Sequence, residues 1–177
     1  LKAIASCDTA KFMGTWFVIG VKPTVFEKTC SNAVENYTLT DAKKGHINID
    51  FQYNKNVPIE SPIKALPQQG WVQGSDKSNS GEWKVSPFPL VKLPYLILDT
   101  DYDNYCVIGY PSRDYVWIMG RTPQMKKDLY EKLKTDLVEK HQYSLEGLRD
   151  VPQVWTEAER KKRGLTIKEI PDTMLAA

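Results

Sequence analysis

The sequence predicts an all-β domain, either a closed antiparallel meander barrel or a sandwich, followed by one α-helix. Eight short segments rich in β-branched and aromatic residues fill the first two thirds of the chain, separated by turn residues at hairpin spacing. After Thr122-Pro123 the apolar period changes from two to four. The length of 177 residues suits one domain with a full core and is too short for two ordinary ones.

The segments expected to form strands follow one another at short intervals. The clearest is Ile47–Asn54, where four apolar and four polar residues alternate, as in an antiparallel strand with one buried face. Asp41–Gly45 before it reads as a hairpin turn. The expected strands are Thr15–Val21, Val34–Thr40, Ile47–Asn54, Gln69–Gln73, Glu82–Ser86, Tyr95–Thr100, Tyr105–Tyr110 and Tyr115–Arg121.

The helix is expected over Met125–Lys140, on the outside of the sheet. Thr122 is a candidate N-cap, and Pro123 suits the first position of a helix. The apolar stripe of an amphipathic helix is formed by residues four apart, Met125, Leu129, Leu133 and Leu137. The short basic cluster Arg160–Arg163 further on is expected to be a solvated tail.

Composition excludes several classes of protein. Lys and Arg number 24 against 22 Asp and Glu, so the net charge of +2 gives no electrostatic case for a nucleic-acid partner. The longest stretch without a charge, Ala65–Ser75, is too short to span a bilayer. With two His and three Cys, no zinc site of usual spacing can be assembled, and we expect no metal.

Three segments match a known family pattern in the right order and at the right separations. They are Lys11–Phe17, with a glycine two residues before a tryptophan, Thr100-Asp101-Tyr102, and Arg121-Thr122-Pro123. Together these resemble the three sequence motifs of the lipocalins. Phe26–Asn32, Leu93-Pro94-Tyr95 and Ser112–Met119 are similar to the branch that holds apolipoprotein D, bacterial outer-membrane lipocalins and the plant temperature-induced and chloroplast lipocalins.

The resemblance implies an eight-stranded antiparallel up-and-down barrel, closed at one end and open at the other, with the C-terminal helix packed outside. It covers roughly residues 10–156, so we expect one lipocalin domain over 1–156 and a C-terminal extension over 157–177. In the family the motif tryptophan and the arginine of the last strand meet at the closed end, which pairs Trp16 with Arg121. The residues given a structural role on this basis are Gly14, Trp16, Thr100, Asp101, Tyr102 and Arg121.

The resemblance also implies a cavity that binds and carries a small hydrophobic ligand, such as a fatty acid, a lysophospholipid or an isoprenoid. A role in protecting membrane lipids or in stress response would follow, with no cofactor. Strand alternation from Trp16 and Arg121 turns a set of side chains inward, and Phe26 is expected at the mouth. The predicted ligand-binding residues are Val18, Phe26, Ile49, Phe51, Tyr53, Trp83, Val85, Tyr95, Ile97, Cys106, Ile108, Tyr115, Trp117 and Met119.

The alternative is a lipocalin-type enzyme that acts on a lipid, because a few lipocalins are catalytic. Cys106 would face the cavity, and Asp99, Asp101 and Asp103 cluster in the sequence. No His is expected near Cys106 to activate the thiol, and the family gives Asp101 a structural role. The binding function is therefore preferred.

The cysteines leave the compartment open. Relatives in this branch often join the first-loop cysteine, here Cys30, to one near the C-terminus, where this chain has Val154-Trp155. Either Cys7 pairs with Cys30, or all three cysteines are free. The resemblance points to an extracytoplasmic location, secreted, periplasmic or in an organelle lumen such as the chloroplast, and allows peripheral membrane association. The sequence does not choose an oligomeric state.

Overall fold

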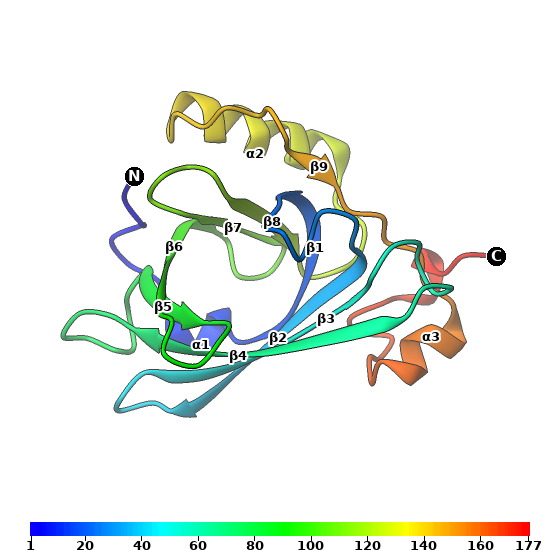
Figure 1. Ribbon diagram of the computed structural model, residues 1–177, viewed down its shortest axis with the longest axis horizontal. Helices are drawn as coiled ribbons and strands as arrows, with labels where there is room; N and C mark the ends of the chain where they lie inside the picture. The colour runs from blue at the N-terminus through cyan, green and yellow to red at the C-terminus, as the bar shows by residue number, and fades with distance from the viewer.

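The computed structural model describes residues 1–177 as a closed β-barrel, with the helices of residues 127–139 and 157–162 outside it (Figure 1). The elements in chain order are α1 (Thr9–Phe12), β1 (Gly14–Lys22), β2 (Ser31–Asp41), β3 (His46–Asn54), β4 (Ile63–Val72), β5 (Glu82–Ser86), β6 (Leu93–Thr100), β7 (Tyr105–Gly109), β8 (Val116–Gly120), α2 (Lys127–Glu139), β9 (Arg149–Asp150), α3 (Glu157–Lys162) and the 3-10 helix η1 (Asp172–Met174).

Closure of the sheet comes from β1. Strands β2 to β7 each pair antiparallel with the next strand along the chain, and β1 pairs with both β8 and β2. The short β9 adds to β1 at Gly20 and Val21. The expected eight-stranded antiparallel up-and-down barrel is therefore confirmed, and the sandwich is excluded. None of the helices has the length and apolar character needed to cross a bilayer.

Apolar side chains at every second position of the strands fill the interior of the barrel. On β3 the apolar residues Ile47, Ile49, Phe51 and Tyr53 are buried, while Asn48 and Asp50 between them are exposed. This is the alternation expected of a strand with one face toward a core. The same period on the other strands builds one continuous interior cluster.

Aromatic packing closes one end of the barrel. Phe12, at the end of α1, is fully buried, and its ring centroid lies 5.3 Å from Trp16, 5.5 Å from Tyr37 and 5.1 Å from Trp83. The guanidinium carbon of Arg121 lies 3.6 Å from the centroid of the Trp16 ring. Gly14 has a φ of +99°, and a Cβ there would lie 3.2 Å from Nη1 of Arg121, so this position suits glycine on both counts.

The turn between β6 and β7 lies at the same end. Asp101 accepts hydrogen bonds from the backbone N–H of Asn104 at 2.8 Å and of Tyr105 at 3.0 Å. The hydroxyl of Thr100 accepts from the N–H of Tyr102 at 2.9 Å and donates to the carbonyl of Tyr105 at 2.8 Å. Arg121 Nε donates to the carbonyl of Tyr102 at 2.7 Å, which ties this turn to β8.

Helix α2 covers the outer face of β6, β7 and β8. Leu133 and Leu137 of α2 are buried in a cluster with the outward apolar residues of these strands, Leu96, Leu98, Val107, Val116 and Ile118. The helix begins at Lys127, two residues after the expected Met125. The hydroxyl of Thr122 donates to the carbonyl of Gln124 at 3.1 Å and caps no helix, so the expected start at Thr122-Pro123 is wrong.

The strand boundaries that differ most from expectation are the starts of β4 and β2, and pairing extends both strands. β4 begins at Ile63, six residues before the expected Gln69, since it pairs with β3 along the whole length from Asn54 to His46. Exposed Lys64, Ala65 and Pro67 hide the strand pattern in this stretch. β2 likewise begins at Ser31 rather than at Val34.

The C-terminal extension packs against the barrel. Ile170 is fully buried in a cluster with Phe17 of β1, Val34 of β2 and Trp155. Arg160, 6% exposed, donates to the carbonyl of Ile170 at 2.6 Å. The expectation of a solvated tail is wrong for Arg160 and Arg163, whose side chains are buried, because outward apolar residues of β1 and β2 give the extension a surface to cover. Lys161 and Lys162 are exposed, as expected.

Candidate functional site

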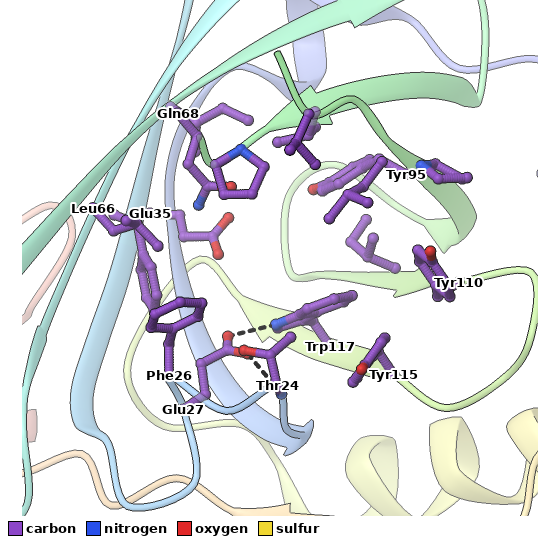
Figure 2. Close-up of a pocket in the computed structure, with 18 of the residues that line it drawn as sticks. Thr24, Phe26, Glu27, Glu35, Leu66, Gln68, Tyr95, Tyr110, Tyr115 and Trp117 are labelled. Carbon is purple, nitrogen blue, oxygen red and sulfur yellow. Dashed lines mark hydrogen bonds between the residues drawn. The ribbon is translucent and has the colours of Figure 1, made fainter. Parts of the chain in front are cut away.

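A cavity of about 310 Å³ occupies the open half of the barrel (Figure 2). Its walls come from the inward faces of the strands, and its rim comes from the β1–β2 and β5–β6 loops. The lining is mostly apolar and consists of Thr24, Phe26, Glu27, Glu35, Ile49, Phe51, Leu66, Gln68, Val85, Pro87, Phe88, Val91, Leu93, Pro94, Tyr95, Ile108, Tyr110, Tyr115, Trp117 and Met119. The volume lies within the range of small-molecule sites.

One carboxylate projects into the cavity from β2. Glu35 is 7% exposed, and its Oε2 accepts a hydrogen bond from the hydroxyl of Tyr37. The Tyr37 hydroxyl lies 2.6 Å from that of Tyr95. Burial raises the pKa of Glu35 from its ordinary 4.5 to about 7, against the lowering effect of the Tyr37 hydrogen bond, and the charge of Glu27 raises it further.

A second carboxylate holds the β1–β2 loop at the mouth. Glu27 is 4% exposed, and its Oε1 accepts from the indole N–H of Trp117 at 2.7 Å. Its Oε2 accepts from the hydroxyl of Thr24 at 2.8 Å and from the Thr24 N–H at 3.2 Å. Both oxygens are therefore occupied, and the bond to Trp117 links the loop to β8, as the dashed lines in Figure 2 show.

Nine of the fourteen predicted ligand-binding residues line the cavity. They are Phe26, Ile49, Phe51, Val85, Tyr95, Ile108, Tyr115, Trp117 and Met119. Phe26 lies at the rim, where its ring centroid is 5.5 Å from that of Phe88 of the β5–β6 loop. That these residues touch a ligand stays a prediction.

The other five predicted residues are buried but do not line the cavity. Four of them belong to the packed cluster around Phe12, where side chains fill the closed half of the barrel. These four are Val18, Trp83, Ile97 and Cys106. The fifth, Tyr53, stacks on Phe51 with ring centroids 5.0 Å apart. Alternation gives the face of the sheet that a side chain occupies and does not give its depth along the barrel.

Sequence reasoning missed both carboxylates. Glu35 shares the inward parity of Tyr37 on β2, so counting back two residues from that buried tyrosine would have placed it inside. Glu27 lies in a loop, where no periodicity applies, and no signal in the sequence marks it.

The cysteines are free and buried. Cys7 lies by the Tyr102 hydroxyl at the closed end, whereas Cys30 lies beside Arg149, whose Nη1 is 3.7 Å from the sulfur, near the mouth. Of the two alternatives, the Cys7–Cys30 bond is absent, because the two residues lie at opposite ends of the barrel, and all three cysteines are free. Burial raises the pKa of both thiols to about 11.

Cys106 is not placed as a nucleophile. Burial raises the pKa of its thiol well above the usual value, and it lies outside the cavity lining. Asp99, Asp101 and Asp103 do not line the cavity either. Of the groups considered for the enzyme alternative, only a carboxylate in the cavity has a counterpart, in Glu35 and Glu27, and both oxygens of Glu27 already accept hydrogen bonds from the protein.

Residues 7–153 match the family model described as a lipocalin-like domain. Temperature-induced lipocalin-1 of Arabidopsis thaliana is 30% identical over 168 residues, covering 90% of this chain and 86% of the relative. Apolipoprotein D of Mus musculus is 32% identical over 136 residues, covering 72% of this chain and 67% of the relative. Outer membrane lipoprotein Blc of Vibrio cholerae is 24% identical over 135 residues, covering 75% of each.

Solved structures share the fold at lower sequence identity. Insecticyanin from the tobacco hornworm Manduca sexta superposes with a TM-score of 0.66 at 18% identity, covering 90% of this chain and 86% of that chain. Lobster apocrustacyanin A1 gives 0.62 at 13% identity, covering 82% and 79%.

Proposed function

Because the chain belongs to the lipocalin family, we propose that it binds and carries one small hydrophobic ligand in the open half of the barrel. The proposed ligand is lipid-like, of the size of a fatty acid, a lysophospholipid or an isoprenoid. The observation that carries the proposal is the apolar cavity of about 310 Å³ with its mouth between two loops. Burial of about 200 Å² of apolar ligand surface would contribute about 5 kcal/mol before the costs of association.

The proposal is tested by titration with the fluorescent apolar probe N-phenyl-1-naphthylamine. We expect saturable binding of one probe per chain and displacement by long-chain lipids. Trp117→Ala removes an indole from the cavity wall and should weaken binding by about 1–3 kcal/mol. Trp71→Ala is the matched control, since Trp71 is not part of the lining.

Thermal melting of both variants is measured in parallel, because Trp117 also holds Glu27. Binding that does not saturate, with the wild-type fold intact, would contradict the carrier function. Equal loss in both variants would place the probe outside the cavity.

We further propose that the open end contacts membrane surfaces during uptake or release of the ligand. Six of the eleven large apolar residues that are exposed lie on the β1–β2, β3–β4 and β5–β6 loops at the open end, Val25, Phe26, Val57, Phe88, Leu90 and Val91. A seventh, Leu93, is the first residue of β6. Exposed Lys28, Lys55 and Lys92 lie among them. An apolar rim with basic residues is suited to shallow insertion into an anionic membrane.

Cosedimentation with vesicles of phosphatidylcholine and phosphatidylserine tests this contact. Leu90→Glu introduces a charge at a fully exposed position of the rim and should reduce binding severalfold. Ile167→Glu introduces the same charge at an exposed position of the extension and should not. Identical sedimentation of the two variants would contradict membrane contact through the rim.

The similarity to an outer membrane lipoprotein supports an extracytoplasmic location, which fractionation of the source cells would test.

The specific observation that favours a second candidate function is Glu35. A buried carboxyl with a pKa of about 7 facing a cavity is suited to general acid–base chemistry, which would make the protein a lipid-modifying enzyme. Mass spectrometry of a bound lipid after incubation separates the two. A carrier returns the lipid unchanged, and an enzyme returns a product that Glu35→Gln does not form.

A further inference from the structure

The polar groups of the cavity are strongly biased toward hydrogen-bond acceptors. Two carboxylates, Glu27 and Glu35, line it, and none of its twenty lining residues is Lys, Arg or His. Both carboxylates are more than nine-tenths buried. A negatively charged head group that entered would find two acidic residues and no cation to pair with.

One acceptor atom is free and faces the cavity. Oε2 of Glu35 is bonded to the Tyr37 hydroxyl, but no protein group donates to Oε1. In Figure 2 the Glu35 carboxylate projects into the open space between the walls. Glu27, in contrast, has both oxygens occupied by Trp117 and Thr24. The structure thus leaves one carboxylate oxygen open to the cavity without a hydrogen bond from the protein, and a ligand can donate one to it.

The tyrosines beside Glu35 reinforce the bias. With Glu35 ionised, Tyr37 donates its only hydrogen to the carboxylate, so the bond of 2.6 Å between the two hydroxyls must be donated by Tyr95. The hydroxyl hydrogens of Tyr95 and Tyr37 therefore both point toward Glu35. The remaining lone pair of Tyr95, at the cavity wall, is a further acceptor.

The other polar groups do not reverse this preference. Gln68, Tyr110 and Tyr115 line the cavity, and none of their side chains makes a hydrogen bond to the protein through the amide or hydroxyl. Each carries both a donor and an acceptor, so they discriminate weakly between head groups. The lysines of the rim lie outside the lining.

We infer that the cavity prefers amphiphiles whose head group donates hydrogen bonds, an alcohol or a protonated amine, and that this head group binds Glu35 with the apolar chain toward the mouth. The inference rests on the proposed function and narrows its ligand class, because a ligand with a carboxylate head group is disfavoured at the inner end of the cavity, beside Glu35. The amine gains a charge-assisted bond to the carboxylate, and the alcohol gains a neutral donor's bond.

The two kinds of donor are distinguished by pH. The titratable groups facing Glu35 are Tyr37 on its own strand, Tyr95 of β6, Cys106 of β7 and Glu27 of the β1–β2 loop. Glu35 loses its charge as pH falls through about 7. Affinity for an amine should then fall, affinity for a carboxylate should rise, and affinity for an alcohol should change least.

The experiment is displacement of N-phenyl-1-naphthylamine by decylamine, 1-decanol and decanoate, which share one chain and differ in the head group. At about pH 8.5 we expect the amine and the alcohol to bind about tenfold or more tightly than the carboxylate. At about pH 5.5 the preference of the amine over the carboxylate should shrink to about threefold or less.

Glu35→Gln should remove most of the preference at about pH 8.5, since the amide retains a partner for Tyr37 but has no charge. Asp50→Asn is the matched control, because it removes one negative charge from the exposed face of the neighbouring β3. Decanoate binding wild type as tightly as decylamine at both pH values would overturn the inference, as would equal effects of the two variants. If Glu35→Gln does not fold, the wild-type pH series decides alone.

Failure of the proposed function gives a different result. In that case the probe itself shows no saturable binding to the wild-type protein. Saturable probe binding without discrimination among the three amphiphiles overturns the head-group inference and leaves the carrier function in place.

Discussion

Arg121 joins three separate segments at the closed end. Besides lying over the Trp16 ring, its guanidinium donates to the carbonyls of Tyr102 at 2.7 Å, Thr15 at 3.0 Å and Lys11 at 2.9 Å. A hydrogen bond from a charged group and a desolvated cation–π contact each contribute on the order of 2 kcal/mol, and less where the contact is exposed, as at Lys11. The residue stabilises the barrel and lies outside the cavity lining.

We therefore expect Arg121→Ala to lower the free energy of unfolding by about 3 kcal/mol or more, which is about 6–12 °C in melting temperature for a chain of this size. Probe affinity below the melting transition should stay within about twofold, since no cavity atom is lost. Differential scanning calorimetry and probe titration measure the two effects. An unchanged melt with lost binding would make Arg121 a ligand residue.

Glu35 should lower the stability of the protein at neutral and alkaline pH. Its pKa is about 7 in the folded protein against an ordinary 4.5, so the folded state binds more protons than the unfolded state between these values. The free energy of unfolding then falls as pH rises through this window and is lowest, for this group, above about pH 7.

Glu35→Gln should accordingly stabilise the protein by about 1–3 kcal/mol at about pH 8 and leave it nearly unchanged at about pH 4. Urea unfolding of the variant and the wild type at both pH values measures this. A stability difference that is the same at both would show that the carboxyl is not desolvated. A gain at high pH would indicate that the acid is kept for its role in the cavity at the expense of stability.

The C-terminal extension covers part of the outer face of β1 and β2. Ile170 and Trp155 pack on Phe17 and Val34, and the Trp155 and Phe17 rings meet edge to face at 5.8 Å. Ile170→Ala should cost about 2–4 kcal/mol, because the side chain is fully buried.

Ile167→Ala is the matched control three residues earlier, where the side chain is 65% exposed, and it should change stability by less than about 0.5 kcal/mol. Urea unfolding compares the two. Equal and small effects would mean that the extension separates from the barrel in solution.

Strand periodicity explains how much of this architecture could be predicted. Alternation on β3, with Ile49 and Phe51 inward, is enough to assign one face of the sheet to the interior. The same rule could not separate Ile108, which lines the cavity, from Cys106 on the same face, because the depth of the cavity is set by Phe12, from a helix outside the strand pattern. Glu35 was not predicted to line the cavity, because burying a carboxylate costs free energy and a glutamate is therefore not expected at an inward position.

The extension escaped prediction for a related reason. The sequence of the extension does not indicate which surface it covers. The indication comes from Phe17 and Val34, which are apolar residues at outward positions of strands whose inner face is also apolar. An apolar residue at an outward strand position indicates a covering element, as Val107 and Ile118 do for α2.

Across the whole molecule the barrel divides into two halves with different tasks. The closed half is packed with aromatic rings around Phe12 and held by Arg121, and it provides rigidity. The open half has an apolar cavity, a buried acceptor at Glu35 and an exposed apolar rim. Rigid support under a cavity keeps its walls open without a ligand, which reduces the ordering cost of binding.

The carrier function requires that a ligand occupies the open half of the barrel. Diffraction from crystals grown with 10-bromodecan-1-ol tests it most directly, because anomalous scattering locates the bromine without reference to the chain. We expect one bromine site per chain inside the mouth, near Phe26 and Trp117, with the hydroxyl at Glu35. Bromine found only on the outer surface of the barrel, with the cavity free of ligand density, would contradict it.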